Sequence, residues 1–252
     1  MKTLFVGQNS FHVESLDSTN SYASEMLRQI APLDGTLVYT FAQKNGRGQR
    51  GNTWESEPNK NVALSLILYP RFLAAEKQFF LTIVASLAVS DVLAELLGNS
   101  TRKVSVKWPN DIYVNEHKVS GILIENTLRE KSINHSVIGI GINVNQVLFN
   151  HAPNASSLKL LTGNEFNLND MIEKVCEKIE AYYLKLRAGR EKELAENYLS
   201  KLYRINEWAN YKDGDELFLG RINGVSEIGK LLLERQNGET KEYDLKEISF
   251  EG

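Results

Sequence analysis

The stretch between Gln43 and Trp54 holds the residue types that could bind an anion. It has almost no apolar side chains, so it cannot be core, and it carries three glycines and two arginines: Gly46, Gly48, Gly51, Arg47 and Arg50. Glycines let neighbouring backbone N–H groups turn together toward an anion. Arginines add a planar fork of donors that suits carboxylate or phosphate. The segment is therefore a candidate anion-binding loop, and the alternative is a flexible, solvated hairpin tip.

Further polar residues lie at the expected ends of strands and helices, and each has an ordinary structural explanation. Ser18, Thr19 and Asn20 precede an apolar-periodic segment, which is typical of a helix N-cap. Donors at a helix start would also suit a small polar ligand. Lys118 could be a solvated hairpin lysine. The remaining corners are the segment 107–111, with its Trp-Pro turn, and Asn143.

Several other kinds of site lack their sequence signals. The four histidines show no metal-ligand spacing and no CxxC companion, so we expect no zinc site. Neither a nucleophile elbow nor a P-loop is present. The single cysteine, Cys176, excludes an intramolecular disulfide, and its apolar neighbours predict a buried thiol on a helix.

Composition places the chain among ordinary globular proteins. With 252 residues, 42% of them hydrophobic, it can form one sizeable core plus a small appended domain. A formal net charge of −3 gives no broad attraction to nucleic acid or to an anionic membrane. The N-terminus lacks the apolar region of a signal peptide, and we expect no span that approaches a membrane helix of about 18 apolar residues. These features predict a cytoplasmic, reduced protein.

Apolar periodicity predicts the elements that position the polar corners. Successive short strands joined by tight corners between residues 104 and 144 indicate an antiparallel meander. We therefore expect an α+β fold, a mixed or mostly antiparallel sheet with helices on one side. The expected strands are 4–6, 11–15, 36–42, 61–69, 104–107, 112–114, 118–125 and 136–144, and the expected helices are 22–30, 76–97, 168–186 and 191–202.

The composition changes after residue 205. From Trp208 onward, short strands alternate with turn residues and predict a small β-barrel-like domain of about five strands. We therefore divide the chain into domains 1–205 and 206–252. Residues 212–252 carry 6 Lys or Arg against 10 Asp or Glu, a net charge of −4, which disfavours a nucleic-acid surface.

In their order and wording, these segments resemble the biotin protein ligases, which attach biotin to the biotin carboxyl carrier domain of carboxylases. The resemblance covers nearly the whole chain and implies a class II synthetase-like ligase domain followed by an SH3-like barrel. The matching segments are Ser-Thr-Asn at 18–20, Gln43, Gly-Arg-Gly-Gln-Arg-Gly at 46–51, Trp54, Lys-Trp-Pro-Asn-Asp at 107–111, Lys-Val-Ser-Gly-Ile-Leu-Ile-Glu at 118–125 and Gly-Ile-Gly-Ile-Asn at 139–143.

The resemblance implies that ATP activates biotin to biotinyl-5′-adenylate before transfer, with Mg²⁺ carried by the ATP phosphates and no metal site of the protein itself. Lys118, Arg47 and Asp111 would be catalytic. The implied biotin-binding residues are Ser18, Thr19, Asn20, Gln43, Gly46, Arg47, Gly48, Gln49, Lys118 and Gly121. The implied contacts to ATP or the adenylate are Arg47, Arg50, Trp54, Asn110, Lys118 and Asn143.

Two departures from the family pattern affect the loop. Many relatives have arginine where this chain has Gln49, and arginine or lysine where it has Asn52. With fewer cations, we expect faster leakage of the adenylate. Some relatives also carry an N-terminal helix-turn-helix domain, and 17 residues before Ser18 are too few for it. We therefore expect a monofunctional ligase that does not bind DNA.

Two other functions share parts of this pattern. A lipoate–protein ligase shares the implied fold and acyl-adenylate chemistry, but the Gly-Arg-Gly-Gln-Arg-Gly loop favours biotin. A non-catalytic sensor of biotin or its adenylate would be signalled by loss of Lys118 or Asp111, and both are present. The expected partner is a biotin carboxyl carrier protein or domain, without nucleic acid or membrane. The residues do not decide between monomer and homodimer.

Overall fold

Strand β5 (Val62–Leu68) lies in the middle of the main sheet, and all seven of its residues are buried. It pairs antiparallel with β2 (Thr36–Thr40) on one side and with β9 (Ser132–Ile142) on the other. A nearly continuous apolar run predicts a strand covered on both faces, and this prediction is confirmed. The structure is a computed structural model that describes residues 1–98 and 100–251, except for the side chain of Arg50.

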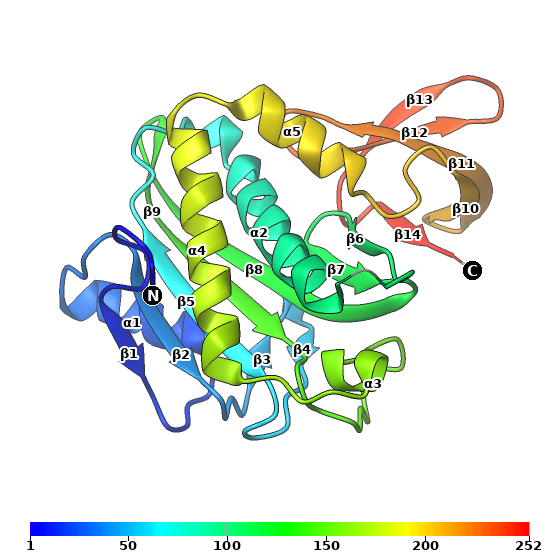
Figure 1. The fold of residues 1–252 in the computed structure, drawn as a ribbon. Coiled ribbons are helices and arrows are strands. Elements are labelled where there is room, and N and C mark those ends of the chain that lie inside the picture. Colours follow the sequence, from blue (N-terminus) through cyan, green and yellow to red (C-terminus); the bar gives the residue numbers. More distant parts are fainter. Residues whose placement is uncertain (99, 252) are drawn as a thin grey trace.

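The main sheet has seven strands in the order β1-β2-β5-β9-β8-β7-β6. Strands β6 (Val104–Lys107), β7 (Asp111–Val114), β8 (His117–Arg129) and β9 form the predicted antiparallel meander. Strand β1 (Ser10–His12) pairs in parallel with β2. The sheet is therefore mixed and mostly antiparallel, and the predicted α+β class is confirmed (Figure 1).

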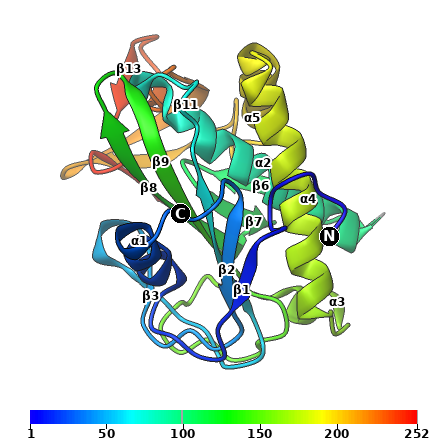
Figure 2. The same ribbon diagram turned by 90° about the vertical axis from the view of Figure 1, so that its left-hand side faces the viewer.

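Helices cover both faces of this sheet. Helices α2 (Phe79–Leu97) and α4 (Leu168–Arg187) pack together on one face with α5 (Glu191–Ser200) beside them, and α1 (Thr19–Gln29) lies on the other (Figure 2). The prediction of helices on one side was therefore wrong. On β5, Leu66 joins the core under α2, whereas its neighbour Ile67 packs in a second cluster with α1. The short helix α3 (Leu158–Thr162) follows the sheet.

Helix α2 is the most apolar of the long helices. Together with the 3-10 turn η2 (Ala75–Lys77), it is long and apolar enough to cross a membrane by length and composition alone. The expectation that no span approaches such a helix was therefore wrong for this segment. In the fold, 72% of its most apolar window is buried against the sheet and neighbouring helices, as in a core helix. It ends at Gly98, as predicted, with φ 58° at that residue.

The predicted strand at 4–6 does not form. Instead, the backbone N–H groups of Leu4, Phe5 and Val6 donate to the carboxylate of Glu180 on α4, at 2.7, 2.8 and 3.0 Å. Glu180 is only 6% exposed. The carboxylate of a residue about 175 positions away thus takes the place of the backbone hydrogen bonds that a strand would have made. These contacts attach the N-terminus to α4.

We expect Glu180→Ala to destabilise the fold by about 3 kcal/mol, because it leaves three N–H groups without an acceptor, one of them buried and two partly buried. Thermal unfolding should show a fall in Tm of roughly 6–12 °C. Glu177→Ala is the matched control, since Glu177 on the same helix accepts a single N–H at 3.2 Å in an exposed position. Equal losses in the two variants would contradict the structural role of Glu180.

The C-terminal segment forms the five predicted strands: β10 (Trp208–Asp213), β11 (Glu216–Val225), β12 (Leu231–Arg235), β13 (Thr240–Tyr243) and β14 (Ile248–Phe250). They make one antiparallel sheet in the order β13-β12-β11-β10-β14. Among the described residues the two outer strands are not paired with each other, so the closed SH3-like barrel stays a prediction.

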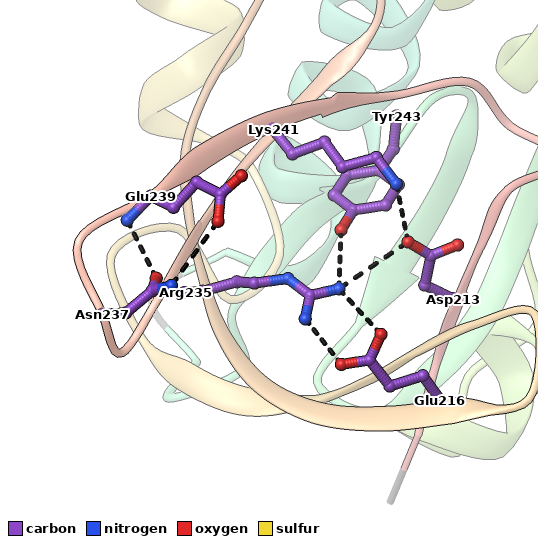
Figure 3. Close-up of polar contacts among 7 residues, drawn as sticks. All are labelled: Asp213, Glu216, Arg235, Asn237, Glu239, Lys241 and Tyr243. Atoms are coloured by element: carbon purple, nitrogen blue, oxygen red, sulfur yellow. Dashed lines mark hydrogen bonds and ion pairs between the residues drawn. The ribbon is translucent and has the colours of Figure 1, made fainter.

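Arg235 connects four of these strands through its guanidinium group (Figure 3). It donates to Glu216 at 2.6 Å, lies 3.7 Å from Asp213, and covers the Phe218 ring at 4.1 Å. Lys241 on β13 donates to the same Asp213 at 2.8 Å. Such a small sheet buries little apolar surface, so this network supplements its core.

The C-terminal sheet also packs against the rest of the fold. Its residues Tyr211, Ile222 and Leu233 belong to the same core cluster as α2. The Trp108 indole N–H donates to the Gly229 carbonyl at 2.9 Å. This packing brings β14 to the edge of the main sheet, beside the polar corners.

Candidate functional site

The glycine and arginine segment is a short hairpin. Strand β3 (Gly46–Arg47) pairs with β4 (Thr53–Trp54), and the 3-10 turn η1 (Gln49–Gly51) joins them. The Gly48 N–H donates to the Asn52 carbonyl at 2.7 Å. Gly46 is buried, and a Cβ there would lie 2.7 Å from the Trp54 carbonyl oxygen. The tight pairing of the two strands fixes the backbone positions from which the side chains of Arg47 and Trp54 project.

The start of α1 serves both as a helix cap and as a wall of the site. Ser18 is the N-cap and accepts from the Ser21 N–H at 3.4 Å. The Thr19 N–H donates to the Gln43 side chain at 2.9 Å, which joins the helix to the hairpin segment. Asn20 is 3% exposed, and its amide accepts from Ser65 at 2.6 Å. The cap interpretation is therefore correct, and these residues also line a cavity.

Two glycines of β9 allow side chains to approach the sheet closely. A Cβ on Gly139 would lie 2.1 Å from the Asn20 Oδ1, and one on Gly141 would lie 2.5 Å from the Trp54 ring. Real Cβ atoms do not approach other atoms so closely. The Gly-Ile-Gly pattern thus makes two adjacent seats on one face of the strand, one for Asn20 and one for Trp54.

Lys118 and Asp111 form an ion pair in the cavity. The Lys118 Nζ lies 2.7 Å from the Asp111 Oδ2, and both side chains are about 30% exposed. The ammonium group also lies 5.7 Å from the centre of the Trp54 ring. The pairing of β7 with β8 shifts register between Ile112 and Tyr113, so that Lys118 lies opposite Tyr113. The lysine is therefore held in place by a carboxylate and an aromatic ring.

The turn that carries Asp111 is fixed from three sides. The Tyr198 hydroxyl of α5 donates to the Pro109 carbonyl at 2.7 Å, and the Asn110 amide donates to the Ile122 carbonyl. Burial raises the pKa of Tyr198, so its hydroxyl stays protonated and remains a donor. The Trp108-Pro109 peptide bond is cis. With the Trp108 contact to Gly229, these bonds hold the corner rigidly.

These residues surround a cavity of about 380 Å³. The predicted site residues that line it are Ser18, Thr19, Asn20, Gln43, Arg47, Gly48, Gln49, Trp54, Asn110, Asp111, Lys118 and Gly121. Of the other three, Gly46 is buried within the hairpin, and the side chain of Arg50 lies outside the described part. Residues distant in the sequence thus come together in one place.

Asn143 does not line this cavity. It is 2% exposed, its N–H donates to the Val119 carbonyl at 2.9 Å, and its Oδ1 is buried without a hydrogen-bond partner in the described part of the chain. It follows directly after β9, which ends at Ile142. The structure therefore gives no direct support to the predicted adenylate contact.

The sequence prediction missed three contributions to the site. Lys107 lines the cavity, and so do Leu245, Ile248, Ser249 and Phe250 from the C-terminal sheet. Glu125 lies beside it, and its Oε2 accepts from Arg47 at 3.0 Å and from Asn20 at 2.8 Å. Lys107 begins one matching segment and Glu125 ends another, so both could have been noted there. The C-terminal residues carry no motif.

The electrostatics of the cavity favour an anion. Among its described wall residues, the cations are Arg47, Lys107 and Lys118, and the single carboxylate is Asp111. Burial lowers the pKa of Lys107, and burial together with the charge of Asp111 raises the pKa of Tyr113 to about 12. A half-enclosed cavity with a mixed polar and apolar lining and an excess of cations suits a small anionic ligand.

Comparison with known proteins identifies the family. Residues 12–143 match the Biotin/lipoate A/B protein ligase family. The bifunctional ligase/repressor BirA of Bacillus subtilis is 34% identical over 251 residues, which cover 96% of this chain and 74% of that protein. The biotin–acetyl-CoA-carboxylase ligase of Paracoccus denitrificans is 29% identical, over 86% of this chain and 90% of that protein.

Comparison with solved structures leads to the same family. The biotin protein ligase from Aquifex aeolicus, in complex with biotin and ATP, superposes with a TM-score of 0.79 at 30% identity, covering 97% of this chain and 99% of that chain. The chain belongs to the biotin/lipoate A/B protein ligase family, and within it to the biotin protein ligases. The family and the catalytic fold predicted from the motifs are thereby confirmed.

Proposed function

We propose that the protein activates biotin with ATP and then biotinylates a carrier protein. In the first step, a biotin carboxylate oxygen attacks the α-phosphorus of ATP, and pyrophosphate leaves as biotinyl-5′-adenylate forms. In the second step, a lysine amine of a biotin carboxyl carrier domain attacks the acyl carbon, loses a proton, and AMP leaves. The observation that carries the proposal is the cavity in which Lys118, Arg47 and the Ser18–Asn20 corner meet.

The first step brings two anions together, so catalysis requires positioning and cationic stabilisation. Lys118 would neutralise the biotin carboxylate and the charge that develops at the α-phosphate. Arg47 would hold the adenylate phosphate. Its pairing with Glu125 involves two half-exposed side chains, which makes a weak ion pair that an arriving phosphate can replace.

The polar ends of the cavity orient the two substrates. Ser18, Thr19, Asn20 and Gln43 would hydrogen-bond the ureido ring of biotin, because they supply hydroxyl and amide groups in a buried place. Trp54 would cover the adenine ring. The ureido ring of biotin and the adenine ring of ATP would thus both be held in place before the carboxylate attacks the α-phosphate.

Asp111 has a role in each step of this proposal. Without ligand it positions Lys118 through the 2.7 Å ion pair. When the lysine turns to the phosphate, the carboxylate becomes available to orient the carrier amine or to accept its proton.

Mg²⁺ would be carried by the ATP phosphates and would neutralise their charge. Among the described residues, no group of three His, Cys, Asp or Glu side chains could hold a metal ion, and Asp111 is the one carboxylate in the cavity wall. A Mg²⁺ ion bound mainly through phosphates and water fits such a wall.

The wider setting is also part of the proposal. The carrier would belong to a carboxylase, and the protein would act in the cytoplasm as a monomer or homodimer, without nucleic acid or membrane. We assign the chemistry to residues 1–205, and 206–252 would form a separate small domain that closes one wall of the cavity.

The test is pyrophosphate release with ATP and Mg²⁺, in the presence of either biotin or lipoate, followed by mass spectrometry of an added carrier domain. We expect release that depends on biotin and one biotin-sized adduct on the carrier. Release driven by lipoate would assign the chain to the lipoate ligases. Tight binding of biotin without turnover would make it a sensor.

A further inference from the structure

Lys107 is a half-buried cation in the cavity wall, and it forms no salt bridge with an acidic side chain among the described residues. Its Nζ lies 5.2 Å from the centre of the Tyr113 ring and 4.9 Å from that of Phe250. In the described part of the chain, its ammonium group makes no hydrogen bond and no ion pair within 4.0 Å. The two rings hold it in place but cannot replace the hydration that it has lost.

The other cations of the described wall are already paired. Arg47 contacts Glu125 at 3.0 Å, and Lys118 contacts Asp111 at 2.7 Å. In the β6–β7 ladder, Asp111 stands directly opposite Lys107, yet its carboxylate is turned to Lys118. Lys107 is therefore the cation of this wall whose charge is left for a ligand.

The surroundings of Lys107 favour an anionic ligand. Burial lowers its pKa, the charge of Asp111 opposes this, and the positive charges of Arg204 and Lys118 lower the pKa further. An anion beside the ammonium group would relieve both the desolvation and the repulsion from the neighbouring cations. The neutral Tyr113 ring adds no competing charge.

The position of Lys107 in the sheet indicates which anionic group of the substrates would bind beside it. It lies on β6, the edge strand, whereas α1 with its ureido-binding corner packs over β2, β5 and β9. The pair Lys118 and Asp111 on β7 and β8 stands between these two ends. A substrate that reacts at Lys118 would thus extend toward β6 on the side away from biotin, where the leaving group of the first step must lie.

We infer that Lys107 binds the β- and γ-phosphates of ATP and holds the pyrophosphate until it leaves. The inference rests on the proposed adenylation and adds the residue that recognises its leaving group. Phe250 of β14 also lies against the lysine, so the C-terminal sheet helps to form this subsite.

The test compares Lys107→Gln with Lys107→Arg and with the control Lys103→Gln. Lys103 precedes the same strand, is 64% exposed and lies 4.0 Å from Glu207, so its loss removes an equal charge outside the cavity. Three quantities are measured: KM for ATP in biotin-dependent adenylation, inhibition by added inorganic pyrophosphate, and transfer from supplied biotinyl-5′-adenylate to a carrier domain.

For Lys107→Gln we expect a KM for ATP and an inhibition constant for pyrophosphate that both rise by roughly tenfold or more, as for loss of a charged hydrogen bond. Transfer from the supplied adenylate should stay within about twofold of the unmodified protein. Lys107→Arg should restore most of the pyrophosphate inhibition, and Lys103→Gln should behave like the unmodified protein.

Unchanged pyrophosphate inhibition in Lys107→Gln would overturn the inference. An equal loss of transfer from the adenylate would also overturn it, since a structural or general role affects both steps. Failure of the proposed function gives a different result, because the unmodified protein would then neither release pyrophosphate with biotin nor use the supplied adenylate.

Discussion

Replacing Lys118 by alanine is expected to lower the rate of biotin adenylation by about 10²–10³-fold, the usual loss when one preorganised group that stabilises transition-state charge is removed. Lys118 is the cation that stands between the polar corner at α1 and the unpaired Lys107, where the carboxylate and the α-phosphate would meet. Pyrophosphate release at saturating biotin and ATP measures the effect. Because the ammonium group serves the transition state, kcat should fall much more than KM rises.

The variant also leaves Asp111 without its partner, so the loss needs a second measurement to interpret it. The double variant Lys118→Ala with Asp111→Asn removes the unpaired charge. If the released carboxylate caused the loss, the double variant would recover adenylation. If Lys118 itself acts on the substrates, the double variant stays as slow as the single one. A single variant within tenfold of the unmodified rate would exclude the catalytic role.

The sequence predicted the elements whose patterns are long and regular. The continuous apolar run of β5 and the helical spacing of α2 leave few alternatives. The side of the sheet that α1 covers was not predictable, because its buried apolar side chains are only Ala23 and Met26. The absence of a strand at 4–6 was not predictable either, because the N–H groups of this segment are bound by Glu180, which is remote in sequence.

For the site, motifs predicted which residues line the cavity but not their pairing. Nothing in the sequence shows that Asp111 pairs with Lys118 and leaves Lys107 to two rings. Likewise, Asn143 stands in a matching motif but lies buried outside the cavity, where its N–H group is bound by the Val119 carbonyl. The choice of partner depends on side-chain directions that only the packed structure defines.

Gly139→Ala and Gly141→Ala are expected to damage the binding of different substrates, because the two glycines seat different side chains. A methyl group on Gly139 would displace Asn20, and one on Gly141 would displace the rigid Trp54 ring. A displacement of about 1 Å can cost 10²-fold. We therefore expect Gly139→Ala to raise KM for biotin about 10²-fold with KM for ATP little changed, and Gly141→Ala to do the reverse.

Gly224→Ala in β11 is the matched control for a glycine change in a strand. Its new Cβ would meet only the side chain of Leu232, whose nearest atom is a methyl group at 3.1 Å, and that flexible side chain can move aside. Both KM values should then stay near those of the unmodified protein. Opposite changes in the two KM values distinguish a displaced side chain from a general loss of stability. A partly unfolded enzyme has fewer active molecules, so its apparent kcat falls whichever substrate is varied. Parallel increases in both KM values for each variant would contradict the assignment of Asn20 to biotin and Trp54 to ATP.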